Sequence, residues 1–216
     1  KVLRLGVGDA VCVLDGRGGR YAARVESVSD GARVRVTEAL PGNEPPARVT
    51  LYQGLPKADK LDFIVQKLTE LGACRVVPVK MERCVVKSDA KDGEKRRERL
   101  DRIAREAVKQ CRRACAPEIE APMTWKQAAN SMAGHDLILV PWEDASGLAM
   151  KGVHAQMPGA RDIGIVIGPE GGMSEGEVDA LRGAGARIVT LGPRILRAET
   201  AAVASVTMAM TLWGDL

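Results

Sequence analysis

The chain has 216 residues and a mass of 23.1 kDa, with 45% hydrophobic and 28% charged residues. This length suits one large domain or two small ones, and the composition excludes a wholly disordered chain. No apolar run approaches the ~20 residues of a membrane-spanning helix, so we expect no membrane contact. The sequence begins at Lys1 without a methionine, in a segment of strand character, and we expect the first domain to lack its start.

Positive charge is concentrated in one segment of the chain. The formal net charge is +4 and the pI is about 8.9, values too mild to indicate a nucleic-acid partner. Residues 91–113, however, hold ten Lys or Arg and five Asp or Glu, so this segment carries +5 and the remainder −1. Aromatic residues make up only 3%, which argues against a sheet surface that stacks single-stranded bases.

The five cysteines include no Cys-x-x-Cys pair. An odd number of thiols is typical of a reduced, cytoplasmic protein. Cys111 and Cys115 can share a helix face, but a zinc site needs two further ligands and the only histidines are His135 and His154. We therefore predict small buried thiols and no metal, and the scarcity of histidine argues against a Ser-His or Cys-His catalytic pair.

Residues 1–46 show a pattern of short strands and turns. Asp-Gly dipeptides follow two of three apolar runs, which indicates hairpins. The runs occupy residues 11–14, 21–28 and 33–37. We predict most of a small β-barrel. The sequence Pro-Gly-Asn-Glu-Pro-Pro at 41–46 breaks helices and strands, so we expect it to link this domain to a second one at 47–216.

Residues 47–216 alternate between strand and helix patterns. Apolar runs typical of buried parallel strands lie at 49–51, 76–79, 137–140, 163–167 and 188–191. Helical spacing follows at 61–71, 100–111 and 199–213, and capping boxes at Thr124 and Ser174 begin two more helices. We predict an α/β domain with helices on both faces of a mostly parallel sheet. Its last helix is apolar nearly all round, as in a dimer interface.

The strand at 163–167 runs directly into Gly168-Pro169-Glu170-Gly171-Gly172, and a capped helix follows. Three glycines let a backbone approach a ligand closely, and open α/β sheets bind ligands at the carboxyl ends of their strands. The spacing fits neither a Walker loop nor the dinucleotide fingerprint. From spacing alone, a ligand-binding loop and a simple tight turn are equally supported.

A second loop leads from a strand into a helix with the sequence Leu-Gly-Pro-Arg-Ile-Leu-Arg-Ala-Glu-Thr at 191–200. Glu199 and Thr200 suit a first helical turn without any function. Arg194 and Arg197 do not, because their charge opposes the positive end of the helix dipole. The pattern leaves open a solvated loop with a surface ion pair and a binding loop close to the core.

The segments IGPEGGMSEGEV and LGPRILRAETAAV resemble the two C-terminal signatures of the RsmE family of SPOUT methyltransferases, which make N3-methyluridine in bacterial 16S rRNA. KADKLDFIVQKLTELG at 57–72, ERCVVK at 82–87 and the segment 98–119 resemble further motifs of that family, in the same order. VLRLGVGDAVCVLDG resembles part of its small PUA-like barrel. The resemblance covers nearly the whole chain.

The resemblance implies a trefoil knot near the C-terminus and S-adenosylmethionine held in the knot loops, mostly by backbone groups. It also implies a homodimer with each active site at the subunit interface. By motif match, the cofactor-binding residues are Leu139, Val140, Gly168, Pro169, Glu170, Gly171, Gly172, Leu191, Gly192, Ile195, Leu196 and Thr200.

The implied reaction is transfer of the sulfonium methyl group to uridine N3, at the family's m3U1498 site. Because N3 must lose a proton, a carboxylate would accept it, and positive charge would stabilise the oxygens of the base. The matching positions give Glu199 and Arg197 as the first catalytic candidates, followed by Arg194 and Glu170.

We expect 16S rRNA, within the small ribosomal subunit, to contact the basic helix and the N-terminal domain. The candidate residues are Lys57, Lys60, Arg83, Lys87, Arg96, Arg99, Arg102, Arg105, Arg112 and Arg113. Without the resemblance, a solvated helix with Arg–Glu pairs would be favoured, since Glu98 and Arg102 are four residues apart.

Other functions remain open at this point. A SPOUT enzyme could methylate another base or a ribose, although ribose enzymes typically have Ser-Leu-Asn where this chain has Arg197-Ala198-Glu199. A non-catalytic ribosome-binding module would bind RNA and not S-adenosylmethionine. A protein that binds a small metabolite through the glycine loop would be indifferent to RNA.

Overall fold

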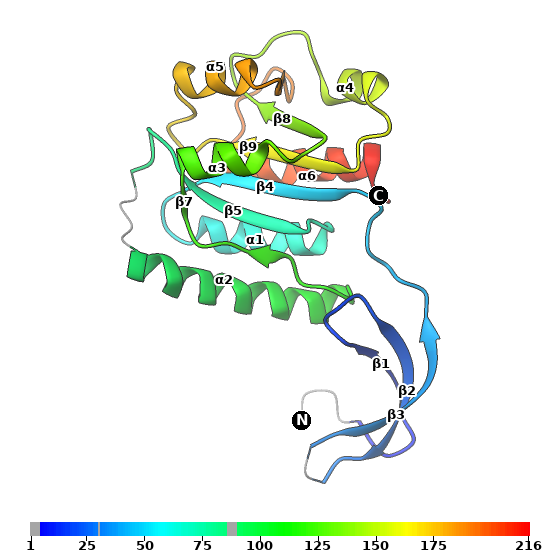
Figure 1. The fold of residues 1–216 in the computed structure, drawn as a ribbon. Helices are drawn as coiled ribbons and strands as arrows, with labels where there is room; N and C mark the ends of the chain where they lie inside the picture. The colour runs from blue at the N-terminus through cyan, green and yellow to red at the C-terminus, as the bar shows by residue number, and fades with distance from the viewer. Residues whose placement is uncertain (1–4, 30, 86–89) are drawn as a thin grey trace.

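The computed structural model describes residues 5–29, 31–85 and 90–216. Its N-terminal part is an antiparallel sheet of β1 (Ala10–Leu14), β2 (Arg20–Ser27) and β3 (Arg33–Leu40). This sheet lies to one side of the remaining chain, beyond the C-terminal end of α2 (Ala90–Cys111) (Figure 1). The strands form where the apolar runs predict them, but within the described residues the sheet is open and not a closed barrel.

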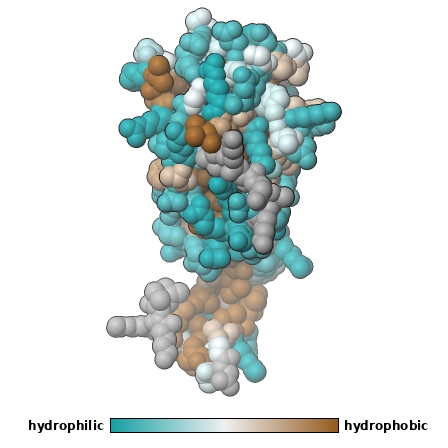
Figure 2. Space-filling view, turned by 90° about the vertical axis from the view of Figure 1, so that its left-hand side faces the viewer, coloured by the Kyte–Doolittle hydropathy of each residue, from teal (hydrophilic) through white to brown (hydrophobic). Residues whose placement is uncertain are grey.

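The N-terminal sheet exposes much apolar surface. Val7, Val28 and Val36 are each at least half exposed, with Val7 at 70%. Figure 2 shows hydrophobic residues gathered on this lower lobe, whereas the larger body above it is mostly hydrophilic on the same side.

The rest of the chain folds around a seven-stranded sheet with the strand order β10–β8–β9–β4–β5–β6, in which β7 also pairs with β5. Its strands are β4 (Arg48–Gly54), β5 (Arg75–Lys80), β6 (Glu118–Ile119), β7 (Met123–Thr124), β8 (Leu137–Pro141), β9 (Asp162–Ile167) and β10 (Arg187–Val189). Neighbouring strands pair in parallel. Parallel strands need crossover connections, so the fold class is α/β, as predicted.

Helices cover both faces of this sheet (Figure 1). One side is covered by α1, α2, α4 and α6, and the other by α3 and α5. The remaining helix bounds are α1 (Lys60–Glu70), α3 (Trp125–Met132), α4 (Met150–Gln156), α5 (Glu175–Gly183) and α6 (Ala198–Trp213). The predicted capping boxes at Thr124 and Ser174 are both present.

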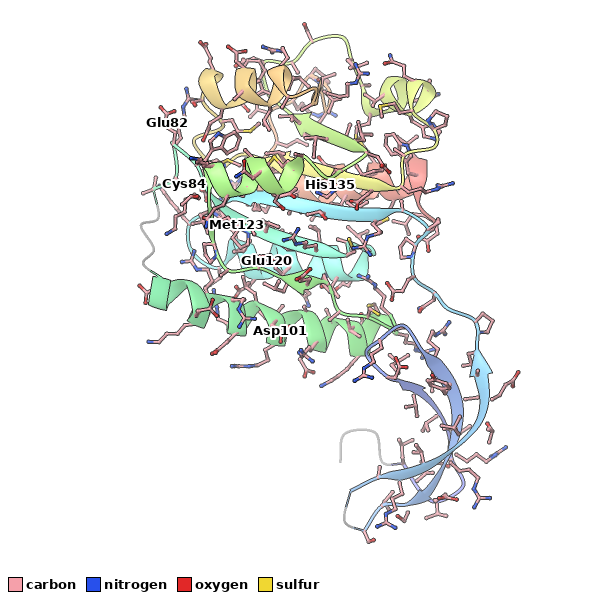
Figure 3. The ribbon with its side chains drawn as sticks, viewed as in Figure 1. Glu82, Cys84, Asp101, Glu120, Met123 and His135 are labelled. Carbon is pink, nitrogen blue, oxygen red and sulfur yellow. The ribbon has the colours of Figure 1, made fainter. Side chains whose placement is uncertain are left out.

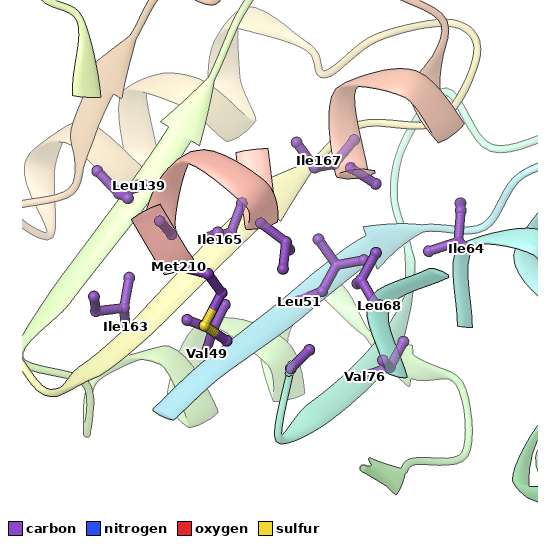
Figure 4. Close-up of a cluster of buried hydrophobic side chains, with 14 of the residues drawn as sticks. Val49, Leu51, Ile64, Leu68, Val76, Leu139, Ile163, Ile165, Ile167 and Met210 are labelled. Carbon is purple, nitrogen blue, oxygen red and sulfur yellow. The ribbon is translucent and has the colours of Figure 1, made fainter. Parts of the chain in front are cut away.

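Successive residues of the central strands point to opposite faces, so each strand supplies two hydrophobic clusters. Leu51 packs with α1 and α6 in the larger cluster, while the adjacent Tyr52 lies in the smaller one under α3 and α5. Figure 4 shows the larger cluster between the sheet and the helices, with Met210 beside Val49 and Leu51 beside Leu68. Burial of these side chains on both faces holds the strands of the sheet in place, and with them the starts of the loops that follow β8, β9 and β10.

Arg113 is buried, which contradicts its assignment to the RNA-binding surface. The residue is only 5% exposed, and its guanidinium pairs with Glu44 of the linker at 2.6 Å between Nη2 and Oε2. The same guanidinium donates to the carbonyl oxygens of Thr69 and Ala73 at 2.8 and 2.9 Å. Arg113 therefore ties residues 41–46 to the end of α1. Both hydrogens on its Nη1 are already donated to carbonyl oxygens, so this nitrogen cannot bind a phosphate.

Removing the partner of this buried charge should be costly. We expect Glu44→Ala to lower the free energy of unfolding by about 3–5 kcal/mol, because Arg113 would stay buried without a counter-charge. Urea denaturation measures the loss. Glu26 pairs with Arg35 at an exposed position, so Glu26→Ala is the control and should cost less than about 1 kcal/mol. Equally small losses would contradict a structural role for Arg113.

Candidate active site

The glycine loop that follows β9 is a closed turn held against the end of β4. A Cβ on Gly168 would lie 2.9 Å from backbone atoms of Gly172 and Met173, and a Cβ on Gly54 would lie 2.5 Å from the nitrogen of Pro169. Gly172 has a φ of +72°, a conformation that favours glycine. The amide of Gln53, a fully buried side chain, donates to the carbonyl oxygen of Gly168 at 3.2 Å. Glycine is thus required for the shape of this loop.

The second predicted loop joins β10 to α6 and lies beside the first. Two cavities of about 400 and 390 Å³ flank it. Residues lining both cavities are Pro141, Glu143, Ile195, Leu196 and Ala201. The loops after β8, β9 and β10 therefore surround one continuous site at the carboxyl ends of three adjacent strands, the position where open α/β sheets bind ligands.

Leu139 and Val140 do not contribute side chains to this site. Both are fully buried, one in each hydrophobic cluster, because they alternate along β8. The cavity wall instead begins with Pro141 and continues to Glu143. Glu143 was not predicted as a site residue, although an acidic residue just beyond a predicted strand end was a usable signal.

The other cofactor candidates divide into two groups. Gly168, Pro169, Glu170, Gly172, Leu191, Gly192, Ile195 and Leu196 line one or both cavities. Gly171 and Thr200 are exposed and are not among the lining residues. The carbonyl oxygen of Gly171 accepts a hydrogen bond from Arg83 at 3.2 Å, so Arg83 supports the outside of the glycine loop.

Lys60, predicted as an RNA contact, lies inside the site between two catalytic candidates. Its ammonium is 3.0 Å from Oε1 of Glu170 and 3.3 Å from Oε2 of Glu199. The amide of Lys57 also donates to Glu170 at 3.0 Å. Burial opposes ionisation of Glu170, but these two donors outweigh it and lower the pKa of the carboxyl. Hydrogen bonding to Glu170 in turn raises the pKa of Lys60.

Arg194 and Arg197 bring positive charge to the two cavities. Arg194 lines the first cavity and Arg197 the second, and both are exposed. Within the part of the chain that the structure describes, neither guanidinium has an ion-pair partner. Two arginines and Glu170 thus line the same site, and Glu199, which lines neither cavity, borders it through its ion pair with Lys60. Such a site can bind an anion and accept a proton.

The basic residues of α2 form a separate surface. Arg99 pairs with Asp59 and Asp62 of the α1 region, and Arg105 pairs with Asp101. Figure 3 shows Asp101 on the side of α2 turned away from the sheet. Arg102 and Arg112 are exposed and Arg96 is partly so. Lys87 lies outside the described residues, so its predicted role is without structural support.

Neither histidine is among the residues that line the cavities. His135 bonds Tyr52 at 2.9 Å and also pairs with Asp162 at the amino end of β9, away from the glycine loop. His154 packs edge-on against Trp213. Proton transfer at this site would therefore depend on carboxylates.

A family model described as an RNA methyltransferase domain matches residues 43–210, and one described as an RNA methyltransferase PUA domain matches residues 1–37. The chain belongs to this family of RNA methyltransferases. The ribosomal RNA small subunit methyltransferase E of Bacillus subtilis is 37% identical to this RNA methyltransferase over 206 residues, which cover 93% of this chain and 80% of the relative.

Two solved structures with related sequences match the fold of this RNA methyltransferase. One is a ribosomal RNA small subunit methyltransferase E from Neisseria gonorrhoeae bound to S-adenosyl methionine, with a TM-score of 0.86 and 32% identity. The other is a methyltransferase from Legionella pneumophila in complex with the cofactor SAM, with a TM-score of 0.86 and 31% identity. Each match covers 100% of this chain and 88% of the other.

Two features are absent from the described residues of this RNA methyltransferase, a membrane-spanning helix and a cluster of metal-binding side chains. No helix there has the length and apolar character required to cross a bilayer. No group of three or more His, Cys, Asp or Glu side chains in the same residues is arranged to hold a metal ion.

Proposed function

We propose that this RNA methyltransferase transfers a methyl group from S-adenosylmethionine to N3 of a uridine in 16S rRNA of the small ribosomal subunit. One observation carries the proposal. The glycine loop after β9 and the arginine loop after β10, the two segments that identify the family, meet around a continuous site that Arg197 and Lys60 line, and Glu199 lies directly behind Lys60, 3.3 Å from its ammonium. The names of the relatives and the bound cofactor of two of them support the same assignment.

The residues around the two cavities fit S-adenosylmethionine. Each cavity lies within the ~300–1,000 Å³ range of small-molecule sites. Gly168 and Gly172 keep the backbone close to the cavity, so N–H and carbonyl groups of this loop would bind the cofactor directly. Glu143 faces both cavities and would complement the positive charge of the cofactor. When bound, S-adenosylmethionine supplies an electrophilic methyl group on a sulfonium.

The chain's own residues would prepare the uracil for attack. N3 carries a proton at neutral pH and must lose it before it can accept a methyl group. Glu199, whose side chain is only 17% exposed, is the proposed proton acceptor. Arg197 and Arg194 would stabilise the negative charge that develops on the base oxygens. Glu170 would act through Lys60, to which it is bound.

RNA would approach across α2 and the N-terminal sheet. Exposed arginines of α2 are proposed phosphate contacts, and each lost contact flattens the dependence of log K on log salt by roughly 0.7–0.9. We expect the triple variant Arg102→Ala/Arg105→Ala/Arg112→Ala to flatten this slope by about 2, as measured by fluorescence anisotropy. Arg182→Ala on α5, across the sheet, is the control. An unchanged slope in the triple variant would remove α2 from the RNA interface.

A homodimer is part of the proposal. Met208 of α6 is 40% exposed, and a cavity of about 470 Å³ lies between α4 and α6. Apolar side chains predominate along it, including Met150, Leu191 and Leu212. A second copy would cover this surface and lie beside the arginine loop, because Leu191 borders the active site as well. Sedimentation velocity measures the association state.

Three further features are proposed from the family. The first is a trefoil knot in the C-terminal region, which is proposed from the resemblance of the loops after β9 and β10 to the family's two C-terminal signatures. The second is a division into a PUA-like RNA-binding domain at 1–46 and a methyltransferase domain at 47–216. The third is a cytoplasmic location, where ribosomal subunits and reduced thiols would be found; the described cysteines form no disulfide.

Methyl transfer from labelled S-adenosylmethionine to isolated small ribosomal subunits tests the proposed substrate class. The subunits come from a strain that lacks the modification, and large subunits from the same strain are the control. We expect label in 16S rRNA only. Label in neither subunit, with the cofactor bound, would overturn the proposed substrate.

A further inference from the structure

Lys60 occupies a place where a lysine is unfavourable on its own. It is the first residue of α1, and the positive end of a helix dipole repels an ammonium. Its side chain is 30% exposed, so solvent only partly compensates. Glu170 of the glycine loop and Glu199 of the first turn of α6, both more than a hundred residues further along the chain, supply the compensating negative charge.

The two carboxylates are held close together by this one ammonium. Both oxygens lie within 3.3 Å of the same nitrogen, so they are about 6 Å apart at most. Two like charges at such a distance, and with exposed fractions of only 27% and 17%, disfavour joint ionisation. Without Lys60, one of the two carboxyl groups would keep its proton to a higher pH.

Among the described residues, Lys60 is the only cation that pairs with Glu170 or with Glu199. Arg197 and Glu143 line the same cavity, one with each sign of charge. Arg83 is engaged with Gly171. Burial raises the pKa of the Cys84 thiol, so this side chain adds no charge near the two carboxylates at neutral pH. Figure 3 shows where Cys84 lies, just beyond the end of β5.

We propose that Lys60 is the positioning residue of the active site, which holds Glu199 and Glu170 as carboxylates and fixes Glu199 for proton transfer. This inference rests on the proposed function, because Glu199 is the proton acceptor there. It replaces the role of Lys60 as a contact for RNA phosphates. Lys57, three residues earlier, uses its backbone amide toward Glu170 and leaves its side chain exposed.

The pH profile of kcat distinguishes a positioning role of Lys60 from a role in RNA contact. In Lys60→Met, the low-pH limb should move up by about one pH unit, because a carboxyl without its cationic partner is harder to ionise. At the acid end, kcat should therefore fall about tenfold more than at the alkaline end, while KM for RNA changes little. Lys60→Arg should restore the profile. Lys57→Met is the matched control and should leave the limb in place.

Titration of the carboxyl groups gives a readout that does not need activity. In protein labelled with ¹³C at the glutamate carboxyl carbons, the Glu170 signal, assigned with Glu170→Gln, should titrate at higher pH in Lys60→Met than in the wild type, because Lys60 helps to lower the pKa of Glu170. Lys60→Gln is a second variant in case the methionine disturbs folding. An unshifted titration, together with a raised KM and a flatter salt slope, would overturn the inference in favour of RNA contact. Failure of the wild type to methylate any RNA would instead count against the proposed function.

Discussion

Gly168→Ala should reduce the affinity for S-adenosylmethionine by at least about 100-fold, roughly 3 kcal/mol. The new Cβ would lie 2.9 Å from backbone atoms on the far side of the turn, Gly172 and Met173, and these atoms cannot move without opening the loop. The N–H and carbonyl groups that face the cavity would then leave their positions. Isothermal titration calorimetry of the purified protein measures the affinity.

Gly176→Ala is the matched control for this loss. Gly176 lies in α5, eight residues after Gly168, and a Cβ there meets nothing within 4 Å. We expect the control to bind the cofactor normally and to be slightly more stable, because alanine favours a helix over glycine. Equal affinity in the two variants would mean that the glycine loop is not the cofactor loop.

The second large effect concerns the proton acceptor. Glu199→Gln should lower kcat about 10²- to 10⁴-fold, because the amide cannot take the proton of uracil N3. Cofactor affinity should stay near the wild-type value, since Glu199 is assigned to the base and not to the cofactor. Single-turnover methyl transfer measures the rate. Glu175→Gln, in the first turn of α5 and exposed, is the control.

Arg197→Ala tests the positive charge that is proposed to stabilise the oxygens of the uracil while Glu199 accepts its proton. Loss of one donor to a developing oxyanion typically costs about 10²- to 10³-fold in kcat. Because Arg197 has no ion-pair partner among the described residues, its removal leaves no uncompensated carboxylate and should not destabilise the fold. Near-normal turnover in both Arg197→Ala and Glu199→Gln, with the cofactor bound, would show that the catalytic assignment is wrong.

Most elements of the fold were predictable because their signals are local. Buried strands such as β9 are continuous apolar runs, and Ser174 with Glu177 forms a capping box that marks the start of α5. The helix α4 was missed, since its N-cap, Ala149, has no side chain able to accept a backbone N–H. The strands β6 and β7 have two residues each, too few for any periodic pattern.

The candidate site was predictable at the level of loops and less so at the level of side chains. The loops after β9 and β10 carry their own glycines and prolines, so their positions follow from sequence. The partners of charged residues do not, because they depend on contacts between distant segments. Lys60 and Arg113 were both assigned to the surface by their charge. In the structure one lies between Glu170 and Glu199, and the other is buried against Glu44.

The identity of the methylated nucleoside tests the central claim most directly. 16S rRNA from small subunits that lack the modification is incubated with the enzyme and S-adenosylmethionine, digested to nucleosides and analysed by mass spectrometry against synthetic standards. Our account predicts N3-methyluridine at a single site, and its loss with Glu199→Gln. A 2′-O-methylated nucleoside or a methylated base other than uracil would contradict the proposed chemistry.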